Sequence, residues 1–412
     1  MKTRKKYFPK VLVMTVSPWS DKIASGNTIS NHLGGWDKLR LSNIFLRNGE
    51  IDNKCCDKYF RISEKEIISS LFSKKDLGVE IFNKNFKKKK LSHQTSFFSL
   101  LKNYFMRKRP AFLLFLREIL WFFGFVKTNK LNKFIKKNDP EFIYLVSPNL
   151  IYAYRVLLYL HKRSNAKIVV FWGDENYNYK NYWPLSILYQ LILRYYIRKT
   201  IKISSINYAA SEELCNYYSS FTEKEFKVHY KGISFTEPVL KKYFQPLKIV
   251  YAGNLLYGRW KVLSMLSKAI DEISFDKKEF ELLIYTGTPL SKEMKKSLNT
   301  NNCSVKQSIP FSQVKKVMKM ADIVLHVESF KKKHINTTRY SFSTKITDCI
   351  ESGNCVMGIG PKQLASINFL IRSQSAIVAS NYNEIVFELQ KIALNHKTII
   401  EKRKKMYEFA KQ

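Results

Sequence analysis

The sequence predicts an α/β protein with two Rossmann-like, doubly wound domains that face a central cleft. Two apolar segments carry this prediction, Lys10–Val16 and Leu247–Ala252, and a glycine loop follows each of them. An apolar run bounded by Gly or Pro is typical of a central parallel strand covered on both faces. A glycine at the carboxyl end of such a strand allows backbone N–H groups to approach a phosphate or a sugar. The chain length of 412 residues also suits two domains of roughly 200 residues each.

The first domain is expected to cover residues 1–233. Its opening strand leads into the loop Ser25–Thr28, and Leu39–Asn48 has a helical pattern. Further along lie, in order, a strand at Glu141–Pro148, a helix at Ile151–Lys162, a strand at Ala166–Gly173, a helix at Leu185–Ile201, a strand at Asn207–Ala210 and a helix capped by Ser211. Asp174 and Glu175 follow the second of these strands. They lie either at the ligand edge of the sheet or at the start of the next helix as simple caps.

The second domain, residues 247–395, alternates between strands and helices as a doubly wound fold requires. Its strands are expected at Lys248–Ala252, Glu281–Thr286, Ser304–Gln307, Ile323–Val327 and Cys355–Ile359, and its helices at Trp260–Ile273, Ser291–Leu298, Phe311–Met320, Thr344–Glu351 and from Asn383 onwards. Residues 234–246 are charged, contain two prolines and lack a helical period, which indicates a linker between the domains. Residues 396–412 are expected to form a basic helix that crosses back to the first domain.

Composition narrows the classes of partner. The formal net charge of +38 fits nucleic acid, an anionic membrane surface or a phosphate-bearing substrate. The basic residues are spread along the whole chain, so nucleic acid is the least favoured of the three. The six cysteines form no CxxC pair and no zinc spacing, and we expect reduced thiols in a cytosolic protein. No window reaches the ~20 apolar residues of a membrane helix, and the apolar run near the N-terminus is too short for a signal peptide.

The most hydrophobic segment is Pro110–Phe125, which has basic residues on both sides. It forms either a buried helix under the sheet or a helix that rests on a bilayer interface, with its flanks on anionic headgroups. Arg117 and Glu118 in its middle argue against a transmembrane span. The Lys-rich residues 73–96 that precede it are expected to form an exposed insertion.

Residues 342–361 carry the sharpest local signal for a binding site. Ser343 and Thr344 are expected to start a helix, whose free N–H groups and dipole favour a diphosphate. Lys345 adds a point charge for the same anion. Asp348 lies one turn further along the same face, where a carboxylate can accept hydrogen bonds from ribose hydroxyls.

These motifs resemble the donor site of GT-B glycosyltransferases, in particular the family 4-like type of bacterial capsule, O-antigen and exopolysaccharide clusters. In those enzymes a helix of this kind carries an acidic residue five positions before a glycine, as Asp348 stands before Gly353. The resemblance implies that Asp348 holds the donor ribose. The second domain of those enzymes opens with a strand, a glycine loop and a basic residue on the diphosphate, which Gly253–Asn254 and Gly258–Arg259 match. The likeness covers residues 10–395.

The resemblance also assigns the other candidate residues. Gly26 and Asn27 resemble the loop that faces the donor phosphates across the cleft. The family has a glutamate where this chain has Tyr340, and Glu328 at the end of its strand is expected to stand in for it. The family's N-domain histidine is also absent here, and either Asp174 or Glu175 is expected to make that contact instead.

The reaction that the resemblance implies is retaining transfer of a sugar from a nucleotide-diphosphate donor to a saccharide acceptor on a lipid carrier. Arg259 and Lys345 would stabilise the negative charge that develops on the β-phosphate. Because two cations face the leaving group and no DxD motif stands out, we expect neither a metal ion nor a cofactor. The protein is then expected in the cytoplasm, on the inner face of the plasma membrane.

Two other function classes stay open on the sequence alone. One is a different nucleotide-sugar enzyme on the same fold, such as an epimerase. The other is a non-catalytic basic protein that binds membrane or nucleic acid through charge. Arg259 also fits a surface position, Asp348 an ordinary helix carboxylate and Gly26 a plain turn. An intact cluster of Arg259, Lys345 and Asp348 favours the transferase, because a binder that acts through charge needs no such placement.

Overall fold

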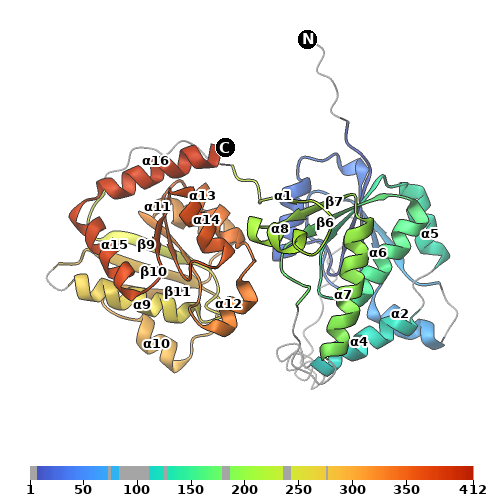
Figure 1. Cartoon of the computed structure of the whole chain (residues 1–412), viewed down its shortest axis with the longest axis horizontal. Helices are drawn as coiled ribbons and strands as arrows, with labels where there is room; N and C mark the ends of the chain where they lie inside the picture. The colour runs from blue at the N-terminus through green and yellow to red at the C-terminus, as the bar shows by residue number, and fades with distance from the viewer. Residues whose placement is uncertain are drawn as a thin grey trace, which may run out of the picture. The chain divides into compact units, whose positions relative to one another are not determined.

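The computed structural model describes residues 7–72, 76–82, 111–124, 128–178, 186–234, 243–274 and 277–411. The chain divides into two compact units, Met1–His229 and Tyr230–Gln412, which we call unit 1 and unit 2 (Figure 1). Most of the expected insertion at residues 73–96, and much of the expected linker at 234–246, lie outside the described residues. The units divide a few residues before the expected boundary, because the Tyr230 ring packs on the rings of Phe342 and Phe369 in unit 2.

Unit 1 is built on an eight-stranded sheet in the order β4-β3-β2-β1-β5-β6-β7-β8. Its strands are β1 (Val11–Thr15), β2 (Leu41–Phe45), β3 (Lys58–Arg61), β4 (Val79–Phe82), β5 (Phe142–Val146), β6 (Lys167–Trp172), β7 (Ile206–Ala209) and β8 (Phe226–Val228). Neighbouring strands run parallel, except for the edge pair β3 and β4. Every residue of β1 and β2 is buried, as expected for parallel strands covered on both faces.

The helices of unit 1 are α1 (Ala24–Leu33), α2 (Glu64–Phe72), α4 (Ala111–Phe123), α5 (Asn129–Asn138), α6 (Ile151–Ser164), α7 (Ser186–Ile203) and α8 (Glu212–Ser219). The predicted helix at Leu39–Asn48 is wrong, because a short 3-10 turn at Lys38–Arg40 leads into strand β2. A strand that is buried on both faces shows no alternation of apolar and polar residues, so its pattern does not distinguish it from a helix.

The apolar segment at Pro110–Phe125 forms helix α4, whose sides differ in exposure. Trp121 and Glu118 are buried, whereas Phe122 and Phe123 are exposed. The buried-helix alternative therefore describes one side of α4, and contact of the exposed side with a bilayer stays a prediction. Within the described residues, no helix has the length and apolar character needed to span a bilayer.

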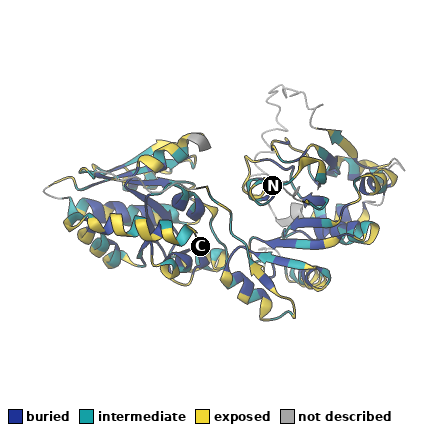
Figure 2. Cartoon of the chain, turned by 90° about the horizontal axis from the view of Figure 1, so that it is seen from above, coloured by how far each residue is buried: buried dark blue, intermediate teal, exposed yellow. Residues whose placement is uncertain are grey.

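Unit 2 is built on a parallel six-stranded sheet in the order β11-β10-β9-β12-β13-β14. Its strands are β9 (Leu247–Ala252), β10 (Phe280–Thr286), β11 (Cys303–Gln307), β12 (Ile323–Val327), β13 (Cys355–Ile359) and β14 (Ile377–Ala379). Alternate residues of β9 enter different cores, since Ile249 and Tyr251 pack on one face of the sheet and Val250 on the other. In Figure 2 the strands are mostly in the colour of buried residues, and the exposed colour lies on the outward sides of helices.

The helices of unit 2 are α9 (Arg259–Ile273), α10 (Lys292–Leu298), α11 (Phe311–Met320), α12 (Lys332–Thr338), α13 (Thr344–Glu351), α14 (Ala365–Ser373), α15 (Tyr382–Leu394) and α16 (Lys397–Lys411). The predicted elements of this unit are confirmed to within a few residues, while α12, α14 and β14 are additional. Helix α16 packs within unit 2. Met406 of this helix is buried in a core of unit 2, and Nε of Arg403 donates to the carbonyl of Gly353 at 2.9 Å.

Candidate functional site

The candidate site in unit 2 lies at the carboxyl ends of β9 and β12. These strands are neighbours, with β10 and β11 on one side of them and β13 and β14 on the other. The strand order therefore reverses between β9 and β12, and a doubly wound sheet binds its ligand at such a point. Gly253 and Asn254 follow β9, and Glu328 follows β12.

Arg259 is held by one partner from each of these two loops. Its Nη2 donates to Oε1 and Oε2 of Glu328 at 3.0 and 3.1 Å, and its Nη1 donates to Oδ1 of Asn254 at 3.0 Å. The side chains of Arg259 and Glu328 are 11% and 5% exposed, so Arg259 is not an ordinary surface residue. Contacts with both carboxylate oxygens fix the direction of the guanidinium.

Lys345 reaches the same place from the first turn of α13. A Cβ on Gly253 would lie only 2.2 Å from the Lys345 Nζ, so the lysine takes the space that glycine leaves. Its Nζ also donates to the Tyr251 hydroxyl at 3.4 Å. Burial, followed by the charge of Arg259, lowers the pKa of Lys345 to about 8. An anion that binds beside two neighbouring, largely buried cations stabilises their charged forms. A diphosphate is an anion of this kind.

Both cations stand where a helix begins. Helix α9 starts after Gly258 and α13 starts after Ser343, and among the described residues neither helix receives a side-chain hydrogen bond from its cap. The first N–H groups of a helix lack partners within it and attract anions together with the helix dipole. Gly258 has a φ of +75°, and a Cβ there would lie 2.7 Å from Oγ of Ser329. Both conformation and space therefore require glycine at this turn.

Two buried side chains belong to the site although the sequence pattern did not single them out. The Tyr251 hydroxyl donates to the Asn254 carbonyl at 2.6 Å and so supports the glycine loop. His326 lies within β12, and its Nε2 is 3.5 Å from Oε1 of Glu328. Burial, then the charges of Lys345 and Arg259, lower the pKa of His326 to about 3, which keeps the ring neutral. A histidine inside an apolar strand was the available signal for this position.

Asp348 lies one turn beyond Lys345 on α13, as predicted, and is paired with another residue. Its Oδ1 accepts a hydrogen bond from Nζ of Lys231 at 2.8 Å, and the two side chains are 19% and 11% exposed. Asp348 is thus a fixed carboxylate in the unit 2 structure. Gly353 ends the helix with a φ of +72°, as predicted, and lies at the end of α13 opposite to Thr344.

The predicted loop at Ser25–Thr28 in unit 1 is wrong, because Gly26 and Asn27 lie in the first turns of α1. A Cβ on Gly26 would lie 2.1 Å from the carbonyl oxygen of Ser20. Glycine here lets α1 pack directly against that backbone. Gly26 is therefore required for the close packing of α1. This role differs from both roles considered in the sequence analysis, a donor-binding loop and a plain turn.

Asp174 and Glu175 lie on the segment that follows β6, at the carboxyl edge of the unit 1 sheet. Asp174 is exposed. Glu175 accepts a hydrogen bond from the backbone N–H of Asn178 at 2.6 Å, which closes a turn, and the next described helix, α7, begins only at Ser186. Burial raises the pKa of Glu175 above its ordinary value.

Comparisons with known proteins identify the fold. No family model and no curated protein matches the sequence. Among solved structures, HepE from Anabaena in complex with UDP is similar to this chain. The match covers 98% of this chain and 95% of HepE, with 12% identity and a TM-score of 0.61. Sucrose-phosphate synthase from Thermosynechococcus elongatus matches 97% of this chain over 94% of its own, with 10% identity and a TM-score of 0.59. An α,α-trehalose-phosphate synthase from Burkholderia xenovorans matches 98% over 96%, with 7% identity and a TM-score of 0.54. The fold of this chain is GT-B, as the sequence predicts.

Proposed function

We propose that this chain is a glycosyltransferase that moves a sugar from a nucleotide-diphosphate donor to a saccharide acceptor. The observation that carries the proposal is the placement of Arg259 and Lys345 at two helix N-termini, where the strand order of the unit 2 sheet reverses. A protein that binds membrane or nucleic acid through charge alone does not need cations that are buried and fixed in this way. HepE, which shares the fold, was solved in complex with UDP, and a diphosphate of that kind fits these cations.

The chemistry follows from the leaving group. As the bond to the anomeric carbon breaks, negative charge builds up on the β-phosphate, and fixed donors placed there lower the barrier. A guanidinium carries five N–H donors and an ammonium three. The bonds that the described residues make to Arg259 and Lys345 use only part of this capacity. The remaining donors can meet the phosphate oxygens without breaking the pair with Glu328.

The other candidate residues have supporting roles in this proposal. The backbones of Gly253, Asn254 and Gly258 let the diphosphate come close, and the first N–H groups of α13, at Ser343 and Thr344, bind its oxygens. Asp348 binds the ribose hydroxyls while Lys231 holds its carboxylate, and Glu328 faces the sugar. Gly353 shapes the end of α13. Asp174 of unit 1 takes the place of the family's N-domain histidine on the donor, and Gly26 supports unit 1 through the close packing of α1.

The biological setting belongs to the same proposal. We assign the chain to the family 4-like enzymes of capsule, O-antigen or exopolysaccharide synthesis, with retention of the anomeric configuration. The acceptor saccharide is then carried by a lipid, and transfer takes place at the inner, anionic face of the plasma membrane. The motif of residues 342–361 and the basic composition of the chain support this assignment.

A donor screen tests the proposal. Purified protein should hydrolyse or transfer from one class among UDP-, GDP- and CDP-sugars, measured by release of the nucleoside diphosphate. Arg259→Ala and Lys345→Ala should each lower turnover ~100-fold or more, since each removes a contact that is strongest in the transition state. Lys268→Ala is the matched control, because this lysine is exposed and lies further along the same helix. Near-normal turnover in both site variants would contradict the donor-site assignment.

A further inference from the structure

Helices α4 and α7 of unit 1 expose a large number of apolar side chains for a folded domain. We call this set the α4–α7 surface. It consists of Leu116, Ile119, Phe122 and Phe123 on α4 and of Ile187, Leu188, Leu191, Ile192 and Tyr195 on α7. Phe122, Phe123 and Ile187 are 62%, 69% and 70% exposed. Exposed apolar residues that gather in this way mark an interaction surface.

The polar residues of α4 are turned away from this surface. Glu118 is buried and accepts hydrogen bonds from the backbone N–H groups of Ile151 and Tyr152 and from the Tyr189 hydroxyl of α7. The guanidinium of Arg117 lies over the Tyr152 ring, 5.7 Å from its centroid. The two charged residues at the centre of α4 therefore hold the helix to α6 and α7, and its outer side stays apolar.

Charge along α7 changes in a regular way. Its exposed side is apolar from Ile187 to Tyr195 and then basic, with Arg198, Lys199 and Lys202 exposed. Helices α5, α6 and α7 contain no Asp or Glu at all. At the second half of α7 the apolar surface is therefore followed by a border of exposed basic residues, and α5, α6 and α7 add no negative charge there.

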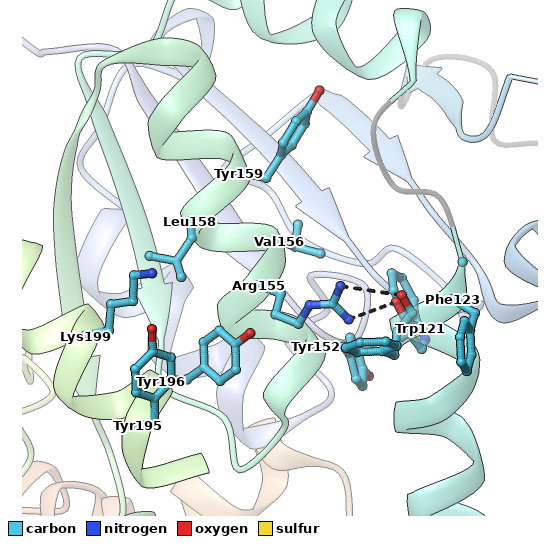
Figure 3. Close-up of a pocket in the computed structure, with 12 residues that line it drawn as sticks. Trp121, Phe123, Tyr152, Arg155, Val156, Leu158, Tyr159, Tyr195, Tyr196 and Lys199 are labelled. Carbon is cyan, nitrogen blue, oxygen red and sulfur yellow. Dashed lines mark hydrogen bonds between the residues drawn. The ribbon is translucent and has the colours of Figure 1, made fainter. Parts of the chain in front are cut away.

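A hollow of about 440 Å³ opens at this border, between α4, α6 and α7. Figure 3 shows Tyr195, Tyr196 and Lys199 on one side of it and Trp121 and Phe123 on the other. Arg155 lies between them, where its Nη1 and Nη2 donate to the last carbonyls of α4 at 3.3 and 3.5 Å.

The floor of the hollow is aromatic. The rings of Trp121 and Tyr152 stack with centroids 4.5 Å apart. Both side chains are buried, and neither the indole N–H nor the phenol O–H has a hydrogen-bond partner in the part of the chain that the structure describes. An oxygen-bearing group that enters the hollow would meet aromatic walls and the cationic groups of Arg155 and Lys199.

We infer that the α4–α7 surface lies on an anionic phospholipid leaflet. In this arrangement the exposed side chains of α4 and of the first half of α7 enter the acyl-chain boundary. Arg198, Lys199 and Lys202 contact lipid phosphates, and the hollow receives one headgroup. Apolar insertion beside a basic border is the combination that binds anionic membranes. This inference deepens the membrane location proposed above and rests on that proposal for its biological meaning, although lipid binding can be measured without any donor.

Charge complementarity favours an anionic leaflet over two other partners, a second copy of the chain and nucleic acid. A symmetric contact between two copies of the chain would bring the basic borders of both together, and like charges across an interface are unfavourable. The phosphates of a nucleic acid would pair with the lysines, but a nucleic acid offers no apolar surface to the exposed leucine and isoleucine side chains. An anionic leaflet is complementary to both parts of the surface.

Binding of the full-length protein to vesicles tests the inference. Vesicles of phosphatidylcholine with phosphatidylglycerol should bind the protein, and vesicles of phosphatidylcholine alone should bind it much less. The double variant Phe122→Ser, Phe123→Ser should lower the affinity ~10-fold or more, because both rings leave the apolar boundary. Lys199→Glu should lower it to a similar degree at low salt and less at high salt.

Matched variants in unit 2 control for general effects. Phe387 on α15 is as exposed as Phe122, at 62%, and Lys391 is an exposed lysine on the same helix. Phe387→Ser and Lys391→Glu should leave vesicle affinity unchanged, and unfolding midpoints should confirm that every variant is folded.

Three results would overturn the inference. The first is wild-type vesicle affinity in both surface variants. The second is equal binding to neutral and anionic vesicles. The third is a dimer in solution that the phenylalanine variants dissociate. Vesicle binding without donor turnover would leave this inference intact and contradict the proposed enzyme, so the two failures can be told apart.

Discussion

At the scale of single residues, the site depends on a lysine whose surroundings disfavour its charge. Lys345 is largely buried beside Arg259, and burial, followed by the charge of Arg259, lowers its pKa from 10.5 to about 8, while Glu328 acts in the opposite direction. A Cβ on residue 253 would overlap with the Lys345 side chain, so glycine is required there. A cation with a pKa near working pH, at the edge of a sheet where ligands bind, is typical of functional sites.

The lowered pKa predicts how nucleotide binding depends on pH. Above about pH 8 the free site loses the Lys345 proton, and a bound diphosphate favours the protonated form. The affinity for UDP or another nucleoside diphosphate should therefore fall as the pH rises through about 8, with uptake of a proton on binding. Calorimetry in buffers of different ionisation enthalpy measures both effects. Lys345→Met should weaken binding at neutral pH and remove this dependence; an unchanged pH profile in that variant would assign the titration to another group.

The lowered pKa of Lys345 also affects the free energy of unfolding, which changes with pH in the opposite direction to the nucleotide affinity. In the unfolded chain Lys345 keeps its ordinary pKa of 10.5, so between about pH 8 and that value the unfolded chain binds more protons than the folded one. The contribution of this group to the free energy of unfolding therefore rises with pH across that window. Charged Lys345 lowers stability at neutral pH, which is a cost that a bound anion offsets.

At the scale of elements, one carboxylate joins three helices of unit 1. Glu118 of α4 accepts from the first two N–H groups of α6 at 3.1 and 2.9 Å, and from the Tyr189 hydroxyl of α7 at 3.1 Å. Burial raises the pKa of Glu118, and these hydrogen bonds act against that effect. The first N–H groups of a helix need partners from outside it, so an acidic residue inside an apolar segment has a structural reason here.

We expect Glu118→Ala to lower the free energy of unfolding by ~1–3 kcal/mol, because it leaves buried N–H groups of α6 without a partner. Glu118→Gln should cost less, since the amide oxygen can still accept. Denaturant unfolding at neutral pH measures both variants, with Glu401→Ala on an exposed position of α16 as the control. A loss for Glu118→Ala no larger than that of the control would mean that the helix start finds another partner.

The elements also show what a sequence pattern can and cannot predict. The strands of unit 2 were predictable because apolar runs alternate there with helical segments, and the candidate residues Arg259, Glu328 and Lys345 were predictable because they stand at the ends of those elements. Strand β2 was not, because burial on both faces removes its alternation. The contact of Asp348 with Lys231 joins residues 117 positions apart, and no local pattern marks such a pair.

At the scale of the whole molecule, the excess of positive charge serves two anionic partners in our proposals. The formal charge is +38, and an excess of this size attracts anions over distances of about one Debye length, ~10 Å at 0.1 M salt. In unit 1 the α4–α7 surface would meet a membrane, and in unit 2 the cations Arg259 and Lys345 would meet a diphosphate. Salt should weaken both encounters, whereas the apolar part of membrane binding should persist at high salt.

The balance of charge further predicts that transfer needs no divalent metal. Arg259, Lys345 and two helix N-termini already offer positive charge to the leaving diphosphate, so Mg²⁺ would compete for oxygens that protein groups can bind. Turnover in excess EDTA should equal turnover with Mg²⁺ or Mn²⁺ added, within about twofold. Arg259→Ala should change this result, because a metal ion can then supply part of the missing charge, and its residual turnover should rise when Mg²⁺ is added. Loss of wild-type activity in EDTA with rescue by either metal would mean that the cations do not face the leaving group, and the roles of Arg259 and Lys345 would have to be reassigned.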